Sequence, residues 1–388
     1  MCAGYLRRRP PWRENGVVPS ALAELKILDF SRVLAGPFAT MMLADLGAAV
    51  TKIEPPGGDE TRHWGPPYDQ AGEATYFQAV NRNKRSLVLD LTDRAQRDRA
   101  QALARENDVL VENFRPGVTE RFGLDYDTVR QENAGIIYCS ITGFGGGRGA
   151  ALPGYDLLIQ ALGGLMSITG APDGEPQKVG VALVDVLAGL FASVGILAAL
   201  EHRRESGQGQ RIEVDLLSSL LAGLVNQASA YTVAGVVPQR MGNQHPSIAP
   251  YEPLRCAGDE LVLAVGNDRQ FGLLCEVVGL PGLAGDPRFA TNRARVEHRS
   301  ALRTMLEERL AARPASAWVD ALTEAGVPAG VVNDIGGAFG LARELGLRPT
   351  VTIEREDGTT VELTRNPIGL SLTPPIYRSA PPRFRPLG

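Results

Sequence analysis

Short apolar runs alternate with amphipathic segments through the first 150 residues. Residues 25–30 (LKILDF) predict a strand, the segment that follows has helical periodicity and ends at Gly47, and residues 49–54 predict a second strand. A strand, a helix and a strand within about 30 residues form a βαβ unit, whose strands lie parallel with a right-handed connection. The pattern therefore predicts an open parallel sheet.

The same alternation continues along the chain. It predicts strands at 86–91, 108–113 and 135–142, a helix at 92–105 and a short helix after Gly117. Because strands and helices alternate, we expect a doubly wound, Rossmann-like α/β domain with helices on both faces of the sheet.

From residue 154 onward the pattern becomes more helical and then mixed. It predicts helices at 156–169, 185–203 and 214–234, a hairpin at 254–266 turned at Gly258, helices at 268–278, 297–312 and 316–325, a strand at 327–333, a helix at 338–345, and a hairpin at 351–363 turned at Gly358. The segment from 254 to 333 has the length and mixture of a small α/β domain.

Composition and charge narrow the function classes. The 388 residues are 44% hydrophobic and 22% charged, which is typical of globular proteins and long enough for two or three domains. The formal net charge of −4 offers no overall positive field for nucleic acid or an anionic membrane, so we expect neither as a partner. The four cysteines and four histidines form no metal-ligand spacing, so no metal site is predicted.

Two segments bear on location. Residues 179–200 are long enough to span a bilayer, but the charge of Asp185 and the many small residues favour a buried helix of a soluble protein. The first 15 residues are rich in arginine and poor in acids, which is a feature of organellar transit peptides, although Pro10 and Pro11 interrupt any helix. We expect a cytoplasmic protein, with mitochondrial import as the alternative.

Ligands of open parallel sheets bind beyond the carboxyl ends of the strands, so the loops there are candidate binding segments. The glycine-rich run that begins at Gly143 follows a predicted strand, but no helix starts directly after it and the first strand lacks the GxGxxG fingerprint. This argues against a dinucleotide site. The run is either a loop without chemistry or a loop whose amides approach a ligand.

Two kinds of charged residue stand out. The basic residues Lys84, Arg85, Arg115 and Arg121 are spaced to bind phosphates, or they form a solvated rim. Asp185 lies between apolar runs at a predicted helix start, where acids are rarely buried without a partner. It is either an N-cap that accepts a backbone amide bond or a nucleophile kept ionised by those amides.

At these same positions the sequence resembles the class III CoA-transferases, the family of formyl-CoA transferase, carnitine CoA-transferase and the α-methylacyl-CoA racemases. The resemblance runs from about Leu25 to the C-terminus, and the residues of its motifs are most similar to those of the succinyl-CoA–dicarboxylate (glutarate-type) transferases. The matching motifs are LDFSRVLAGPFATMMLADLGAAVTKIE (28–54), NRNKRSLVLDL (81–91), DVLVENFRPG (108–117), YCSITGFG (138–145), GYDLLIQALGGLMSITG (154–170), VDVLAGL (184–190) and GNQHPSIAPYEPL (242–254).

The resemblance implies chemistry and contacts. The family's catalytic carboxylate falls at Asp185, which would form aspartyl anhydride and aspartyl-CoA thioester intermediates while CoA moves from an acyl-CoA, such as succinyl-CoA, to a free carboxylic acid. Coenzyme A is then a cosubstrate, with no permanently bound cofactor. The implied CoA-binding residues are Val33, Ala35, Asn83, Lys84, Arg85, Asn113, Phe114, Arg121, Gly143 and Phe144.

Departures from family members refine the expectation. Pro55 and Thr142 stand where formyl-CoA transferase has an arginine and a lysine, and residues 242–246 replace its run of four glycines, which argues against formate as the substrate. The racemase branch, the main alternative, has a histidine where this chain has Tyr155, and a phenol with an ordinary pKa of about 10 is a poor base at pH 7. A non-catalytic CoA-binding protein is a third, weaker hypothesis.

The resemblance also implies an architecture. Family members are interlocked homodimers in which each chain has a large α/β domain built from both ends of the sequence and a small domain from the middle. For this chain we expect a disordered extension at 1–22, the first part of the large domain at 23–220, a linker and small domain at 221–334, and a return to the large domain at 335–388.

Overall fold

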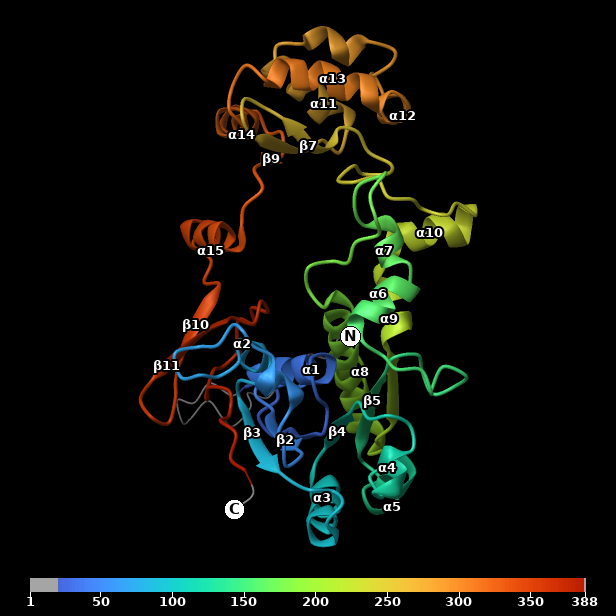
Figure 1. The fold of residues 1–388 in the computed structure, drawn as a ribbon, viewed down its shortest axis with the longest axis vertical. Helices are drawn as coiled ribbons and strands as arrows, with labels where there is room; N and C mark the ends of the chain where they lie inside the picture. Colours follow the sequence, from blue (N-terminus) through green and yellow to red (C-terminus); the bar gives the residue numbers. More distant parts are fainter. Residues whose placement is uncertain (1–19, 387–388) are drawn as a thin grey trace, which may run out of the picture. The chain divides into compact units, whose positions relative to one another are not determined.

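The computed structural model describes residues 20–386, which fold into two compact units (Figure 1). Of the described residues, the first unit comprises 20–163, 179–232 and 348–386, and the second comprises 164–178 and 233–347. The second unit was expected at 221–334. Its main segment begins and ends about 12 residues later than that, and the unit also includes 164–178. The expected N-terminal extension lies outside the described residues, apart from 20–22.

A six-stranded parallel sheet forms the centre of the first unit, with the strand order β3-β2-β1-β4-β5-β6. The strands are β1 (Lys26–Asp29), β2 (Ala49–Glu54), β3 (Lys84–Val88), β4 (Val109–Glu112), β5 (Ile137–Thr142) and β6 (Arg211–Asp215). The chain order reverses between β1 and β4, so the loops after these two strands diverge and open a crevice at the sheet's carboxyl edge. The predicted parallel α/β fold is confirmed.

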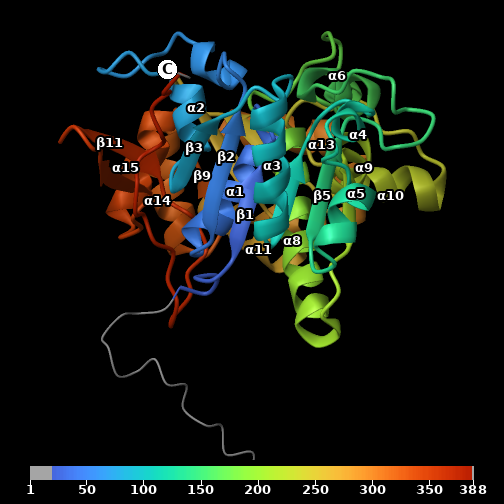
Figure 2. The same cartoon turned by 90° about the horizontal axis from the view of Figure 1, so that it is seen from below.

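Helices cover both faces of this sheet. In Figure 2, α3 (Arg94–Glu106) and α5 (Tyr126–Glu132) lie in front of it, where Ala100, Ala104 and Val129 pack against Leu28 and Leu110. On the opposite face, α1 (Ala35–Asp45) and α8 (Leu183–Ser206) pack against each other and against the strands. The sheet is therefore doubly wound.

Smaller elements complete the first unit. These are η2 (Glu60–His63), α2 (Thr75–Ala79), α4 (Val118–Arg121), α6 (Asp156–Leu162), α9 (Leu216–Gly223) and the antiparallel hairpin β10 (Thr350–Glu354) and β11 (Thr360–Thr364). The helix α10 (Val225–Ala234) begins in the first unit, and its last two residues belong to the second. The C-terminal segment then runs back over the sheet domain, where the amide of Ile376 donates to Asp45 O (2.8 Å) and that of Asn83 donates to Ser379 O (3.0 Å).

The second unit has its own core. Three antiparallel strands, β7 (Tyr251–Arg255), β8 (Glu260–Ala264) and β9 (Ala329–Gly330), pack with helices through residues such as Leu263, Phe271 and Trp318. The helices of this unit are α7 (Leu165–Ile168), α11 (Asp268–Val277), η3 (Pro281–Gly285), α12 (Asn292–Glu297), α13 (Arg299–Leu310), α14 (Ala315–Glu324) and α15 (Ile335–Glu344).

Two predicted helices are wrong in detail. The helix predicted at 156–169 ends at Leu162, because Gly164 adopts a left-handed conformation (φ 86°) that separates α6 from α7. The helix predicted at 214–234 begins only at Leu216, because residues 211–215 form the edge strand β6, and Val225 (φ 40°) then separates α9 from α10. The predicted strand at 86–91 is β3, which starts two residues earlier and ends at Val88.

α8 is the one helix within residues 20–386 that is long and apolar enough to cross a membrane. In this structure it packs along α1, α9, β5 and β6. One face of the helix is buried by these contacts, but Leu190, Phe191, Val194 and Leu197 remain exposed, so the fully buried helix predicted from the sequence is wrong within this chain.

Candidate active site

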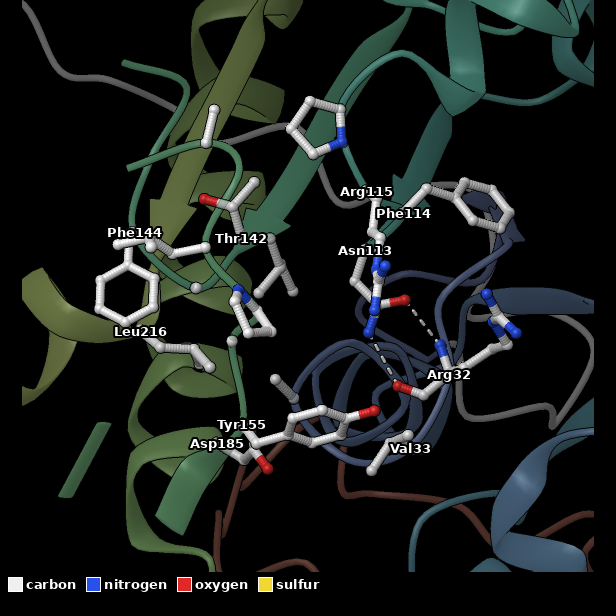
Figure 3. Close-up of a pocket in the computed structure, with 18 of the residues that line it drawn as sticks. Arg32, Val33, Asn113, Phe114, Arg115, Thr142, Phe144, Tyr155, Asp185 and Leu216 are labelled. Carbon is white, nitrogen blue, oxygen red and sulfur yellow. Dashed lines mark hydrogen bonds between the residues drawn. The ribbon is translucent and has the colours of Figure 1, made fainter. Parts of the chain in front are cut away.

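A pocket of about 520 Å³ opens at the carboxyl edge of the sheet, in the crevice between β1 and β4. Figure 3 shows Thr142, Phe144, Leu216 and Asp185 along one side and Arg32, Val33, Asn113 and Phe114 along the other. All of these residues belong to the first unit. Seven of the predicted site residues line this pocket: Val33, Ala35, Asn113, Phe114, Gly143, Phe144 and Asp185.

Asp185 occupies the third position of α8, within the first turn of the helix. The N-cap position belongs to Ala182, which offers no side-chain cap, so the N-cap interpretation of Asp185 is wrong. No hydrogen bond or ion pair of its carboxylate is found among residues 20–386, although the side chain is largely buried. Burial and the nearby charge of Asp156 raise the pKa of Asp185 to about 7. The carboxylate is therefore desolvated, unpaired and open to the pocket.

Asp156 at the start of α6 ties down the beginning of α8. Its Oδ1 accepts from the amide of Val184 (2.8 Å), and its Oδ2 accepts from Nε2 of Gln160 (2.6 Å). The helix that carries Asp185 is thus capped by a side chain from another helix. Asp156 was not among the predicted site residues, although an acid at the first position of a predicted helix was a signal for it.

The elevated pKa predicts a pH-dependent stability. Between about pH 4 and pH 7 the folded protein binds a proton at residue 185 that the unfolded chain releases, so the ionised group costs stability above pH 7 and nothing below pH 4. Asp185→Asn is therefore expected to have a larger free energy of unfolding than the parent at pH 8, by at most about 4 kcal/mol, and the same free energy of unfolding near pH 4. Urea titrations at both pH values measure this; equal midpoints at pH 8 would argue against a raised pKa.

α8 approaches α1 closely at Gly189, one turn beyond Asp185. A Cβ atom at Gly189 would lie 2.6 Å from the backbone oxygen of Ala35, in the first turn of α1. Since both helix starts line the pocket, this contact sets the spacing between them.

Gly189→Ala is expected to disturb both the fold and the site. Alanine favours a helix by about 1 kcal/mol over glycine, but here the added methyl group meets backbone that cannot rotate away, and overpacking of this kind costs about 1–3 kcal/mol. We expect a lower melting temperature and a slower reaction. Gly272→Ala in α11, where a Cβ meets nothing within 4 Å, is the control and is expected to leave both unchanged or to raise the melting temperature slightly.

Four predicted CoA-binding residues lie outside the pocket. The side chain of Asn83 binds Asp45 Oδ1 and the carbonyl of Ile376 (2.8 Å each), and Lys84 Nζ donates to Asp29 Oδ2 (3.1 Å), Pro37 O (2.9 Å) and Asn81 Oδ1 (3.1 Å). Burial lowers the pKa of Lys84 to about 8 despite the attraction of Asp29. Both side chains are committed to internal contacts. The two residues lie at the start of β3, and the Lys84 side chain reaches along the sheet to Asp29 at the carboxyl end of β1.

The other two are exposed. Arg85 lines a separate groove with residues of the C-terminal segment, and Arg121 lies at the end of α4 beside the ring of Phe122. By contrast, Arg32 and Arg115, of which only Arg115 was singled out from the sequence, both line the pocket.

A smaller, more apolar cavity of about 340 Å³ adjoins the first and shares Arg32, Phe114 and Arg115 with it. Its other walls include Pro55, Pro56, Leu89 and Leu91, from the ends of β2 and β3. The two cavities together suit an elongated ligand with an apolar or aromatic end. Within residues 20–386, no three His, Cys, Asp or Glu side chains group to hold a metal ion.

Comparison with known proteins decides the family. Residues 22–384 match the model of CoA-transferase family III. The chain belongs to this family. It is 43% identical over 372 residues to succinate–glutarate CoA-transferase of Agrobacterium fabrum, covering 94% of this chain and 92% of that one. It is 38% identical over 383 residues to human succinyl-CoA:glutarate CoA-transferase, covering 96% and 86%.

A solved structure agrees in fold. A CAIB/BAIF family protein from Brucella suis has a TM-score of 0.83 and 42% identity, covering 94% of this chain and 96% of that one. The predicted family and enzyme class, a family III CoA-transferase, are thereby confirmed. The substrates of this transferase are CoA thioesters and carboxylic acids.

Proposed function

We propose that this transferase moves CoA from the thioester of a dicarboxylic acid, with succinyl-CoA as the donor, to a second carboxylic acid, and that Asp185 is the nucleophile. The observation that carries the proposal is the unpaired Asp185 carboxylate in the pocket at the sheet's switch point. A buried acid without a counter-ion lowers the stability of the fold, and a catalytic role as the nucleophile explains why the protein has one here.

The reaction balances without water or a redox partner. An Asp185 oxygen attacks the thioester carbonyl and CoA leaves as thiolate, giving a mixed anhydride. The thiolate attacks the aspartyl carbonyl and releases the donor acid, giving an aspartyl-CoA thioester. The acceptor carboxylate displaces the thiolate to form a second anhydride, and the thiolate then takes the acceptor acyl group and frees Asp185.

The two adjoining cavities support a placement for CoA. We propose that the acyl and pantetheine end occupies the larger cavity beside Val33, Ala35, Gly143 and Phe144, while the nucleotide end extends past Phe114 into the apolar cavity. Arg115, at their junction, and Arg121, on the nearby surface, are the phosphate partners of this placement.

Arg32 supports a dicarboxylate substrate. Arg32 lines the reactive pocket, and its guanidinium pairs with the half-exposed Glu60 (2.9 Å), so it is available to exchange that partner for the second carboxylate of a substrate. The relatives named for succinate and glutarate fit this choice of substrate. A relative from Acetobacter aceti, 42% identical over 320 residues, is named for acetyl-CoA and oxalate, so the acceptor must be measured.

We also propose that the protein is a homodimer. Leu190, Phe191, Val194 and Leu197 form an exposed apolar stripe on α8, with 64% of Val194 accessible, and such a face is typical of a surface covered by a partner. Light scattering with size exclusion tests this, since a monomer at micromolar concentration would contradict it.

The substrate assignment is tested with succinyl-CoA and a panel of free acids in heavy water. We expect CoA exchange with glutarate or another dicarboxylate, slow exchange with formate, and no deuterium at the α carbon of the thioester. Deuterium incorporation without CoA exchange would instead indicate the racemase activity.

A further inference from the structure

Val33 has an unusual backbone conformation for its residue type. Its φ of 69° lies in the left-handed region, which a β-branched side chain rarely adopts, since the Cβ atom then crowds the backbone. A residue held there is strained, and it persists only where the surrounding structure fixes it. Val33 lies in the loop between β1 and α1 and lines the pocket, so the strained residue belongs to the site.

Asn113, directly after the neighbouring strand β4, binds both backbone groups of Arg32, the residue before Val33. Asn113 Oδ1 accepts from the amide of Arg32 (2.9 Å), and Asn113 Nδ2 donates to the carbonyl of Arg32 (2.9 Å), as Figure 3 shows. The amide side chain thus bridges β4 to the loop as a backbone ladder would. Both functional groups are occupied by this contact.

A buried ion pair, Lys52 and Asp59, also binds the loop that contains Val33. Lys52 Nζ donates to the carbonyl of Ser31 (2.8 Å) and pairs with Asp59 (2.8 Å), and both side chains are completely buried. Asp59 Oδ2 also accepts from the amide of Val33 (3.4 Å). The turn around Val33 is therefore held through its polar backbone atoms by three side chains.

The loop leads directly into the first turn of α1, which contacts α8. Ala35, two residues after Val33, has its carbonyl against Gly189, one turn beyond Asp185. Any relaxation of Val33 toward an ordinary φ would redirect the start of α1, and the wall of the pocket facing Asp185 would move with it.

We propose that Asn113 is a positioning residue: with the Lys52–Asp59 pair it holds Val33 in the left-handed conformation and so fixes the first turn of α1 against the reactive carboxylate of Asp185. This inference rests on the proposed function of Asp185. It gives Asn113 a role through the loop, where the family resemblance implies a contact with CoA.

A rescue experiment separates the two roles. Asn113→Ala removes the bridge, and Val33→Gly lets the turn keep its conformation without strain, because glycine adopts positive φ freely. Val33→Ala is the matched control, since it removes nearly the same side chain but keeps the Cβ atom. All single variants and both double variants are assayed by rapid-quench intact mass for acylation of Asp185 and by steady-state exchange.

We expect Asn113→Ala to slow acylation by about 10-fold or more while the KM for the donor changes less than about 3-fold. Adding Val33→Gly is expected to restore at least about a third of the lost rate, and adding Val33→Ala to restore none. A raised KM with an unchanged acylation rate, or equal effects of glycine and alanine, would overturn the proposal.

If Asn113→Ala does not fold, the single variants at residue 33 decide. We expect Val33→Gly to melt at a higher temperature than Val33→Ala, since only glycine relieves the strain. A lower melting temperature for Val33→Gly would overturn the inference. Failure of the proposed function is distinct, because Asp185 of the parent protein would then carry no acyl group at all.

Discussion

Asp185→Ala is expected to lower the kcat for CoA exchange by at least about 10³-fold, because the other carboxylate that lines the pocket, Glu60, is paired with Arg32 (2.9 Å). The donor should still bind with nearly unchanged affinity, since the walls of both cavities remain. Exchange of label between succinyl-CoA and succinate measures the rate, and isothermal titration with CoA measures the binding.

The control for this variant is Asp125→Ala. Asp125 caps α5, where its carboxylate accepts from the amide of Thr128 (3.0 Å), and it lines neither cavity. We expect this variant to lose about 1 kcal/mol of stability and to keep its exchange rate. An Asp185→Ala protein with more than a few per cent of the parent activity would contradict the nucleophile assignment.

Arg82→Met is expected to lower the free energy of unfolding by about 3–5 kcal/mol. Arg82 forms two hydrogen bonds with the fully buried Asp45, at 2.9 and 2.6 Å. The same carboxylate accepts from Asn83 (2.8 Å) and from Asn366 (3.2 Å), which joins the C-terminal segment to the sheet domain. Removing Arg82 leaves a buried charge without its counter-ion. Urea denaturation measures the loss.

Arg94→Met is the matched control, because Arg94 pairs with Asp98 at 4.0 Å on the exposed face of α3. Surface pairs of this kind contribute about 0–1 kcal/mol, so we expect little change. Similar losses for the two variants would contradict the assignment of Arg82 and Asn83 to a structural network.

The pattern of hydrophobic residues predicted the fold correctly where buried residues recur at the regular spacing of a strand or a helix. The strands near 25–30 and 49–54 and both hairpins appear where their apolar runs and Gly-containing turns predicted them. β6 was missed because it is an edge strand with the polar sequence RIEVD and no apolar run of its own. The break at Gly164 was missed because the apolar periodicity continues on both sides of the glycine.

The site was predictable where chemistry and topology coincide. Asp185 stood out because a lone acid in an apolar helix is costly, and Asn113 and Phe114 because they follow a strand. Asn83 and Lys84 were implied as CoA contacts by the family resemblance, whereas in the structure they lie at the start of β3 and bind Asp45 and Asp29. The strain at Val33 and the cap from Asp156 depend on tertiary contacts, which no local pattern contains.

Trapping with hydroxylamine during turnover is the most direct measurement. The parent protein is incubated with succinyl-CoA and hydroxylamine, digested and mapped by mass spectrometry. An activated Asp185 carbonyl, whether anhydride or thioester, predicts a hydroxamate on the peptide that contains residue 185 and on no other peptide. Continued CoA exchange with Asp185 unmodified, or with the hydroxamate on another residue, would contradict the account.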